Sequence, residues 1–244
     1  MGAKSLSHVL AGIERTKDRL LDAGAASEAA RIQIIAAVMA YWGSHPGVAV
    51  SIVEKLLNYA ILSPAVVVQW ALSGHDGSRL AQAHVYEMVA HTVAKVTGRA
   101  RQVLLLTSAA GGVVMNVDGG LAAGDVPEVQ AMRDLFKLLD DLLVAWASGS
   151  KDEMIEAADD GTDSRDRLVK RWGHRWQRVF RRRAAIEEAF VIDVGKQAVV
   201  AAAEAAEAAA LGAGDADAVA AAMDVVPANG ANGEEHRSDE VEIQ

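Results

Sequence analysis

The sequence predicts an all-α fold built as an antiparallel helical-repeat array, and three observations support this prediction. Alanine is abundant, whereas only 5% of the 244 residues are aromatic and only four are proline. Alanine enters a helix at almost no energetic cost, and strands are normally enriched in β-branched and aromatic residues. In most segments apolar residues recur at three- and four-residue steps, which is typical of helices. Seven or so such segments joined by short turns predict an α-α superhelix.

The first two helices are expected at residues 5–21 and 27–42. In both segments the apolar side chains recur at helical spacing and form one broad face. We expect Gly24 to end the first helix. In the second helix, Gly43 follows Trp42 where a residue in the left-handed conformation commonly ends a helix, so we expect that conformation at Gly43.

Two prolines are expected to start the third and fourth helices. Pro46 fits the first turn of the third helix, because its missing N–H is not needed there. Apolar residues nearly encircle this helix, which predicts burial on several sides. Ser63 and Pro64 give a second start signal, a capping serine followed by a proline, for a short helix that ends at Leu72. Residues 73–77 are expected to form a turn.

Three longer helices are expected in the rest of the chain. The first covers 78 to about 105. Asp125 and Glu128 resemble a capping box, in which each residue bonds the backbone N–H of the other, and they open a helix that runs to about Ala147. The last strongly periodic helix is expected from about 164 to 192.

This pattern suggests three regions of different character. Residues 1–192 are expected to form a helical-repeat domain that contains a mobile, glycine-rich loop at 108–124. Residues 193–226 are alanine-rich and able to form a helical extension, although they offer little large apolar surface. Residues 227–244 are polar and acidic, so we expect a disordered tail.

The net charge of −9 is carried by the C-terminal end of the chain. Residues 1–190 hold 22 basic and 22 acidic side chains, whereas 191–244 hold 11 acidic and two basic ones. The acidic total therefore does not count against RNA-associated work by the helical body. Cysteine is absent, which excludes disulfides and thiolate zinc sites and favours an intracellular protein. No apolar run approaches the roughly 18 residues of a membrane span, so no membrane partner is expected.

Few side chains are arranged for catalysis or metal binding. His84, Glu87 and His91 fall on one helical face at i, i+3 and i+7, a spacing suited to three metal ligands. We favour a partly exposed polar stripe, since no fourth ligand accompanies them. The glycine pairs in the 108–124 loop match no nucleotide-binding motif, and the acidic run at 152–163 reads as a solvated linker. We therefore expect no catalytic residue, no cofactor and no metal.

A basic helix at 165–183 is the charged feature that says most about function. Nine arginines and lysines stand there against one acid, Asp166, with Trp172 and Trp176 one turn apart. Such a helix can track phosphates while its aromatic rings stack on bases. The alternative, which we favour, buries both tryptophans in the core and leaves the arginines solvated or paired. The candidate contacts for RNA or a partner are Arg171, Arg175, Arg178 and Arg182, and the expected structural anchors are Trp42, Pro46, Pro64, Trp70, Trp172 and Trp176.

Five segments, taken in order, resemble the large subunit of the nuclear cap-binding complex, specifically its C-terminal third domain. The most specific is YWGSHPGVAVSIVEKLLNYAILSPAVVVQWAL at 41–72. It combines an aromatic-x-x-x-His-Pro turn, a helix with a valine–acid–lysine run, and a helix that starts at proline and ends near tryptophan. The other four are SLSHVLAGIERTKDRLL, SRLAQAHVYEMVAHTVAKV, LFKLLDDLLVAWA and RWGHRWQRVFRRRAAIEEA. The resemblance covers about residues 4–190.

The resemblance implies a fold like the middle domain of translation initiation factor 4G, the third of three such domains in the full subunit. The chain therefore resembles a fragment of that subunit. Large subunits of this family are non-enzymatic scaffolds in a heterodimer, and the small partner, which has an RNA-recognition motif, holds the capped RNA. The resemblance also implies a nuclear protein, with shuttling to the cytoplasm left open, that links capped transcripts to splicing, export and decay. No cap-stacking residue is expected here, because those residues belong to the small subunit.

Two alternatives of other classes stay open. The chain could bind RNA directly through the basic helix at 165–183. It could also be a helical-repeat adaptor in translation initiation, since related middle domains serve there. Enzymatic activity is a more distant alternative.

Overall fold

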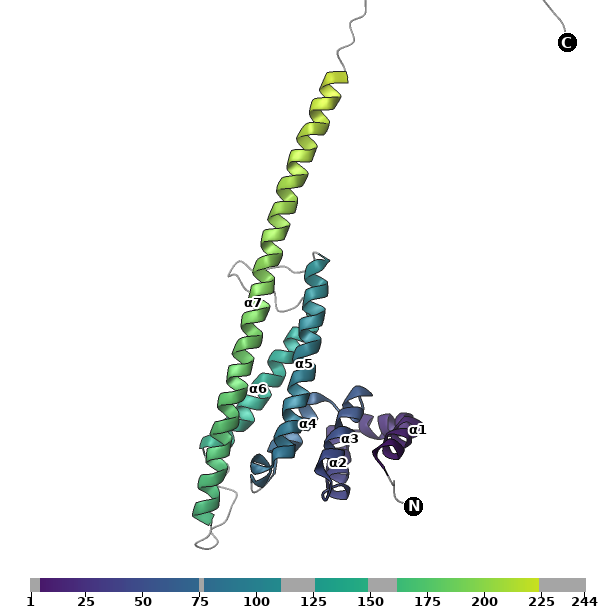
Figure 1. Cartoon of the computed structure of the whole chain (residues 1–244), viewed down its shortest axis with the longest axis vertical. Helices are drawn as coiled ribbons and strands as arrows, with labels where there is room; N and C mark the ends of the chain where they lie inside the picture. Colours follow the sequence, from purple (N-terminus) through teal and green to yellow (C-terminus); the bar gives the residue numbers. More distant parts are fainter. Residues whose placement is uncertain (1–4, 75–76, 111–125, 149–161, 224–244) are drawn as a thin grey trace, which may run out of the picture. The chain divides into compact units, whose positions relative to one another are not determined.

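The computed structural model describes residues 5–74, 77–110, 126–148 and 162–223, and within the last range the side chains of 167–209. These residues are helical and include no strand, so the predicted all-α helical array is confirmed (Figure 1). The α-helices are α1 (Leu6–Ala25), α2 (Glu28–Tyr41), α3 (Pro46–Asn58), α4 (Pro64–Leu72), α5 (Ala83–Ala109), α6 (Pro127–Ser148) and α7 (Thr162–Met223), with a 3-10 helix, η1 (Ser78–Ala81), before α5. None of the described helices combines the length and apolarity needed to cross a lipid bilayer.

Serine caps and prolines begin several of these helices. The hydroxyl oxygens of Ser27 and Ser63 accept from the backbone N–H groups of Ala30 and Val66, at 3.1 and 3.3 Å. These bonds satisfy amide groups that the first turn of a helix leaves without a partner. Pro46 and Pro64 are the first residues of α3 and α4, as their sequence positions predict. Local sequence therefore sets where these helices start.

The short helix α4 lies in the middle of the core. It packs against α2, α5 and α6, and six of its nine residues are buried. Its C-terminal carbonyl groups are also buried, and two side chains from elsewhere bond them. The Trp146 indole N–H of α6 donates to the Leu72 carbonyl at 2.8 Å, and the Arg79 guanidinium donates to the Trp70 carbonyl while lying over the Trp70 ring. A buried helix end needs such partners.

The two glycines expected to end helices do not act in that way. Helix α1 continues through Gly24 to Ala25. Gly24 is buried beside the Ile61 carbonyl oxygen, which would lie 3.1 Å from an added Cβ, so close packing explains this glycine. Gly43 is not left-handed, because among the described residues only Ala60 and Gly77 have a positive φ. Helix α2 ends without a left-handed residue, in a turn closed by the His45 N–H on the Trp42 carbonyl.

The helix expected at 78–105 is two elements. The chain turns through the 3-10 helix η1, takes an extended conformation at Gln82, and then forms α5 to Ala109. Gly77, at φ 62°, precedes η1 and packs so closely that an added Cβ would lie 2.4 Å from Val169 Cγ1. The bond of Arg79 to the end of α4 fixes η1 against the core. Tertiary contacts therefore override the helical periodicity here.

The last helix continues beyond the strongly periodic segment expected at 164–192, into the alanine-rich residues that were expected to be able to extend it. Helix α7 extends past 192 to Met223, because its alanine-rich sequence favours a helix even where little is buried. The chain divides into two compact units, 1–199 and 200–244. In the second unit, 200–223 are helical and the side chains of 200–209 are exposed. The domain limits expected from the sequence stay predictions.

Several predicted features lie outside the described residues. These are His75 and Asp76 of the turn, residues 111–124 of the glycine-rich loop, Asp125 of the capping box, residues 152–161 of the acidic run, and the tail at 227–244.

Replacing Trp70 with alanine should lower the free energy of unfolding by about 3–5 kcal/mol, because truncation of a buried tryptophan leaves a cavity in the core. The side chain is 6% exposed and supports Arg79. Urea unfolding followed by circular dichroism measures the change. Tyr41, which is 67% exposed, provides the control, since Tyr41→Ala should change stability by less than about 0.5 kcal/mol. An unchanged midpoint for Trp70→Ala would contradict this role.

Candidate functional site

The arginine-rich part of α7 has two faces. Side chains on the first face bond to α5 and α6, and we call this set of charged contacts the clamp. The Arg181 guanidinium donates from Nε and Nη2 to the two carboxylate oxygens of Asp140 on α6, at 2.6 and 2.9 Å. Gln177 donates to the same carboxylate at 3.3 Å. These bonds, chiefly that from Arg181, hold the pKa of Asp140 below its usual range.

Two consecutive glutamates of α7 complete the clamp. Glu187 is 1% exposed and accepts from Arg101 of α5 at 2.5 Å and from Arg183 at 2.7 Å. Glu188 accepts from Nε of Arg133 on α6 at 3.0 Å and, with its other carboxylate oxygen, from Nη2 of the same guanidinium. This hydrogen bonding raises the pKa of Arg133. Helices α5, α6 and α7 are therefore joined side by side by charge-assisted bonds (Figure 1).

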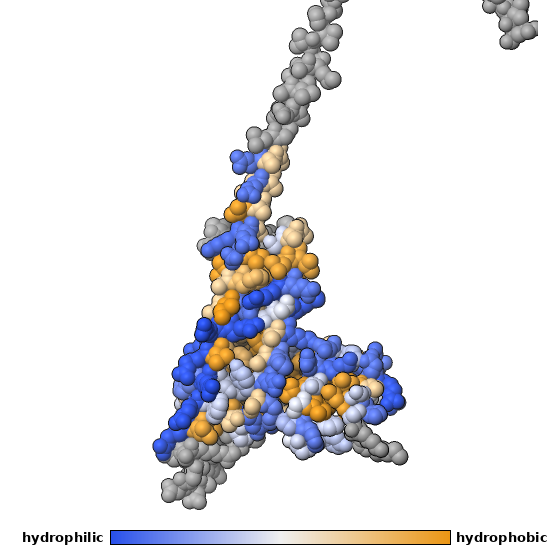
Figure 2. Space-filling model, in the orientation of Figure 1, coloured by the Kyte–Doolittle hydropathy of each residue, from blue (hydrophilic) through white to orange (hydrophobic). Residues whose placement is uncertain are grey.

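The second face of the same segment carries Arg171, Arg175, Arg178 and Arg182, which we call the arginine stripe. Steps of four, three and four residues place them on one side of the helix over about 16 Å. All four side chains are exposed, and none forms an ion pair with another residue in the part of the chain that the structure describes. Figure 2 shows hydrophilic residues along α7 where this segment runs. The stripe is thus a line of four available guanidinium groups.

Aromatic side chains border the stripe. Trp176 is 1% exposed and contacts the rings of Tyr86 and Phe180 edge-on, with centroids 5.2 and 6.1 Å apart. Trp172 is half-buried, and the Arg175 guanidinium lies over its ring at 5.1 Å. Tyr86, both tryptophans, Arg175, Val179 and the start of α5 line a cavity of about 300 Å³, which we call the aromatic pocket.

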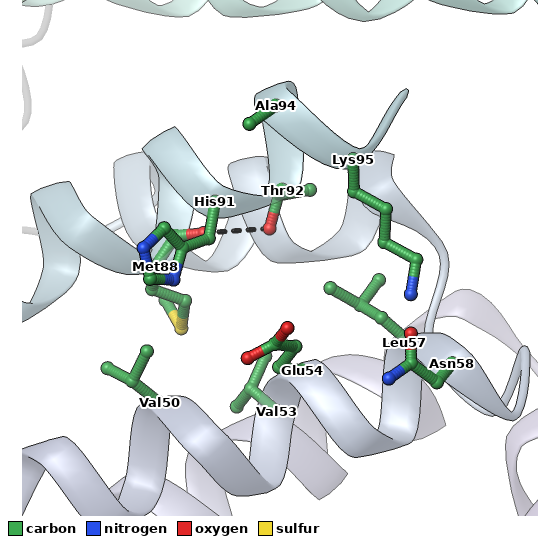
Figure 3. Close-up of a pocket in the computed structure, with 10 residues that line it drawn as sticks. All are labelled: Val50, Val53, Glu54, Leu57, Asn58, Met88, His91, Thr92, Ala94 and Lys95. Atoms are coloured by element: carbon green, nitrogen blue, oxygen red, sulfur yellow. Dashed lines mark hydrogen bonds between the residues drawn. The ribbon is translucent and has the colours of Figure 1, made fainter. Parts of the chain in front are cut away.

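A second hollow lies between α3 and α5, and we call it the α3–α5 groove. Its volume is about 410 Å³. Val50, Val53 and Met88 form an apolar floor, and Thr92 turns its hydroxyl to the Met88 carbonyl at 2.8 Å (Figure 3). Glu54 of α3 and Lys95 of α5 also line the groove, and both are exposed at its rims. An apolar floor between rims of opposite charge suits a protein partner.

The three residues considered as metal ligands do not assemble into a site. His84 is half-buried, whereas Glu87 and His91 are exposed, and His91 lines the α3–α5 groove. Among the described residues no three or more ligand-type side chains lie close enough to hold a metal ion.

Of the expected anchors, Trp70 and Trp176 are buried, while Trp42, Pro46, Pro64 and Trp172 are half-buried. Apart from the opposite charges of Glu54 and Lys95, no sequence pattern pointed to the α3–α5 groove. Its floor residues are apolar like other core residues, and periodicity does not show which gap between helices stays open. No local sequence pattern indicated the pairing of Arg101 with Glu187 or of Arg133 with Glu188, because the partners lie 86 and 55 residues apart. Exposed charges of opposite sign at Glu54 and Lys95 were the available hint.

Comparison with known proteins gives two findings. A family model described as MIF4G like matches residues 1–189. The protein named nuclear cap-binding protein subunit 1 of Schizosaccharomyces pombe is 26% identical over 102 residues, which are 42% of this chain and 13% of the relative. The chain thus matches a small part of that longer protein.

The contribution of the Asp140–Arg181 pair to stability should disappear in acid. Since the folded pKa of Asp140 is below its ordinary 3.8, the pair stabilises the fold above that pH and loses its effect as the pH falls through the folded pKa. The difference in unfolding midpoint between the wild type and Asp140→Asn should therefore be larger at pH 7 than at pH 3. In an Arg181→Ala background this pH dependence should shrink. Equal differences at both pH values would refute the assignment.

Proposed function

The chain belongs to the MIF4G-like family, and we propose that it serves as a non-enzymatic helical scaffold in a nuclear cap-binding complex. The observation that carries the proposal is the family match over 1–189, which runs from α1 through the clamped part of α7. The similarity to a protein named nuclear cap-binding protein subunit 1 supports the choice of complex. On this proposal the protein works in the nucleus.

The distribution of charge supports a scaffold rather than an enzyme. Catalytic groups usually have perturbed pKa values inside a cleft. Among the described residues, shifted pKa values occur at Arg133, Lys137, Asp140 and Arg181, and the largest cause of each shift is a hydrogen bond to an oppositely charged side chain. The pairs of Arg133 with Glu188 and of Arg181 with Asp140 join α6 to α7, which helps to make a rigid interaction surface.

The proposed partner is a small subunit with an RNA-recognition motif, which would hold the capped RNA while this chain supports it. The complex would then connect capped transcripts to splicing, export and decay. The α3–α5 groove is the surface that we assign to this partner. Its floor supplies apolar area at the centre of an interface, and Glu54 and Lys95 supply rim charges that select orientation.

The 244-residue chain should bind the small subunit from the same organism in a pull-down and in isothermal titration. Reversing the rim charges, with Glu54→Lys and Lys95→Glu combined, should weaken binding at least about tenfold, which equals about 1.4 kcal/mol. The matched control reverses two exposed charges of opposite sign on α1, with Asp18→Lys and Arg19→Glu combined, and should bind like the wild type.

Two outcomes would count against this account in different ways. If the wild-type chain fails to bind the small subunit, the proposed complex is wrong. If the chain binds but the rim variant keeps full affinity, the complex stands and the groove is not the interface.

A further inference from the structure

We infer that the arginine stripe and the aromatic pocket together bind single-stranded RNA directly. This inference goes beyond the scaffold role, in which the small subunit holds the RNA, and it does not depend on that role. It rests on the stripe's unpaired charges and on the adjoining aromatic cavity.

The arginines in this part of α7 fall into two groups, those bonded to carboxylates and those exposed to solvent. Arg181 and Arg183 end on carboxylates of Asp140 and Glu187. The four stripe arginines are exposed and lack ion pairs within the described residues. Four like charges along about 16 Å of helix repel one another and concentrate counterions. Arginines that neutralise phosphates release the cations condensed on a nucleic acid, and this release favours binding.

The second step is that every member of the stripe is an arginine. A guanidinium offers paired N–H donors that match the oxygens of a phosphate, and it also stacks on aromatic faces. The helix that carries the stripe is held in place by the clamp, at Asp140, Glu187 and Glu188. The guanidinium groups therefore start from a fixed backbone, so less conformational freedom is lost on binding.

The third step is the position of the aromatic pocket. Arg175 belongs to both the stripe and the pocket, where it lies over the Trp172 ring. A cavity of about 300 Å³ lies at the small end of the range for ligand sites. An RNA strand that follows the stripe can place one unstacked base in the aromatic pocket, where Trp172 and Tyr86 offer aromatic surface. Base stacking of this kind tolerates any sequence.

These features favour a single strand over other anionic partners. A duplex keeps its bases stacked inside, so it could use the stripe but not the pocket. An acidic peptide could also pair with the stripe, but it has no flat π-face to place against Trp172 unless an aromatic residue accompanies its acids. Arginine beside an accessible aromatic ring is the combination that single strands use.

The test is fluorescence anisotropy of a labelled, uncapped 12-nucleotide RNA with the 244-residue chain over a series of salt concentrations. No small subunit is present, so failure of the scaffold proposal does not affect the result. The Arg171→Ala and Arg178→Ala double variant should bind at least about tenfold more weakly, and its slope of log affinity against log salt should fall by about 1.4, or 0.7 per lost phosphate contact. The control, Arg15→Ala with Arg19→Ala on α1, removes the same charge and should behave like the wild type.

The pocket is tested by tryptophan fluorescence. RNA should quench the emission, and Trp172→Phe should abolish most of the quenching while leaving the salt slope unchanged, because stacking is not an ionic contact. Circular dichroism checks that this conservative variant is folded.

Four results would overturn the inference: absence of RNA binding, equal losses in the α1 control and the stripe variant, equal competition by a 12-base-pair RNA duplex, or stronger competition by polyglutamate than by unlabelled single strand. The last result would assign the stripe to an acidic protein partner. Unchanged quenching in Trp172→Phe would show that no RNA base stacks on Trp172 in the aromatic pocket.

Discussion

Burial of α4 is the constraint on which the rest of the fold depends. This nine-residue helix has six buried residues, so it must be enclosed on all sides and its backbone ends must find partners away from water. Helices α2, α5 and α6 enclose it, while Trp146 and Arg79 bond the carbonyls at its C-terminus. One of these residues comes from α6 and the other from η1. The same contacts that close the core therefore fix the turn before α5 and the direction of α6.

With α5 and α6 fixed in this way, α7 packs against the core through buried apolar side chains, Trp176, Phe180, Val191 and Val194, and charged pairs join it to α5 and α6. The carboxylates of Asp140, Glu187 and Glu188 take the guanidinium groups that face them, and Trp176 fills the space between. Because Glu187 is buried, removal of its arginine partners would leave a costly charge in the interior. The remaining arginines are turned outward by helical geometry. One segment thus joins the helices and presents a cationic surface.

Local signals predicted much of this structure. Ser63, Pro46 and Pro64 begin helices because a cap or a missing N–H acts within one turn. The errors arose where distant residues decide the outcome, as where the Ile61 carbonyl explains the close packing of Gly24. Helical spacing alone separates the stripe arginines from Arg181, but the carboxylate that Arg181 meets is 41 residues away. Whether the stripe contacts RNA stays a prediction.

In the proposed complex, this chain supports cap binding by a partner. The most direct measurement is the affinity of the small RNA-recognition-motif subunit for a 7-methylguanosine cap analogue, with and without a saturating amount of the 244-residue chain. A scaffold that orders the partner in its binding-competent state should tighten cap affinity, by about tenfold if it removes about 1.4 kcal/mol of ordering cost. The same affinity with and without the chain would contradict the account.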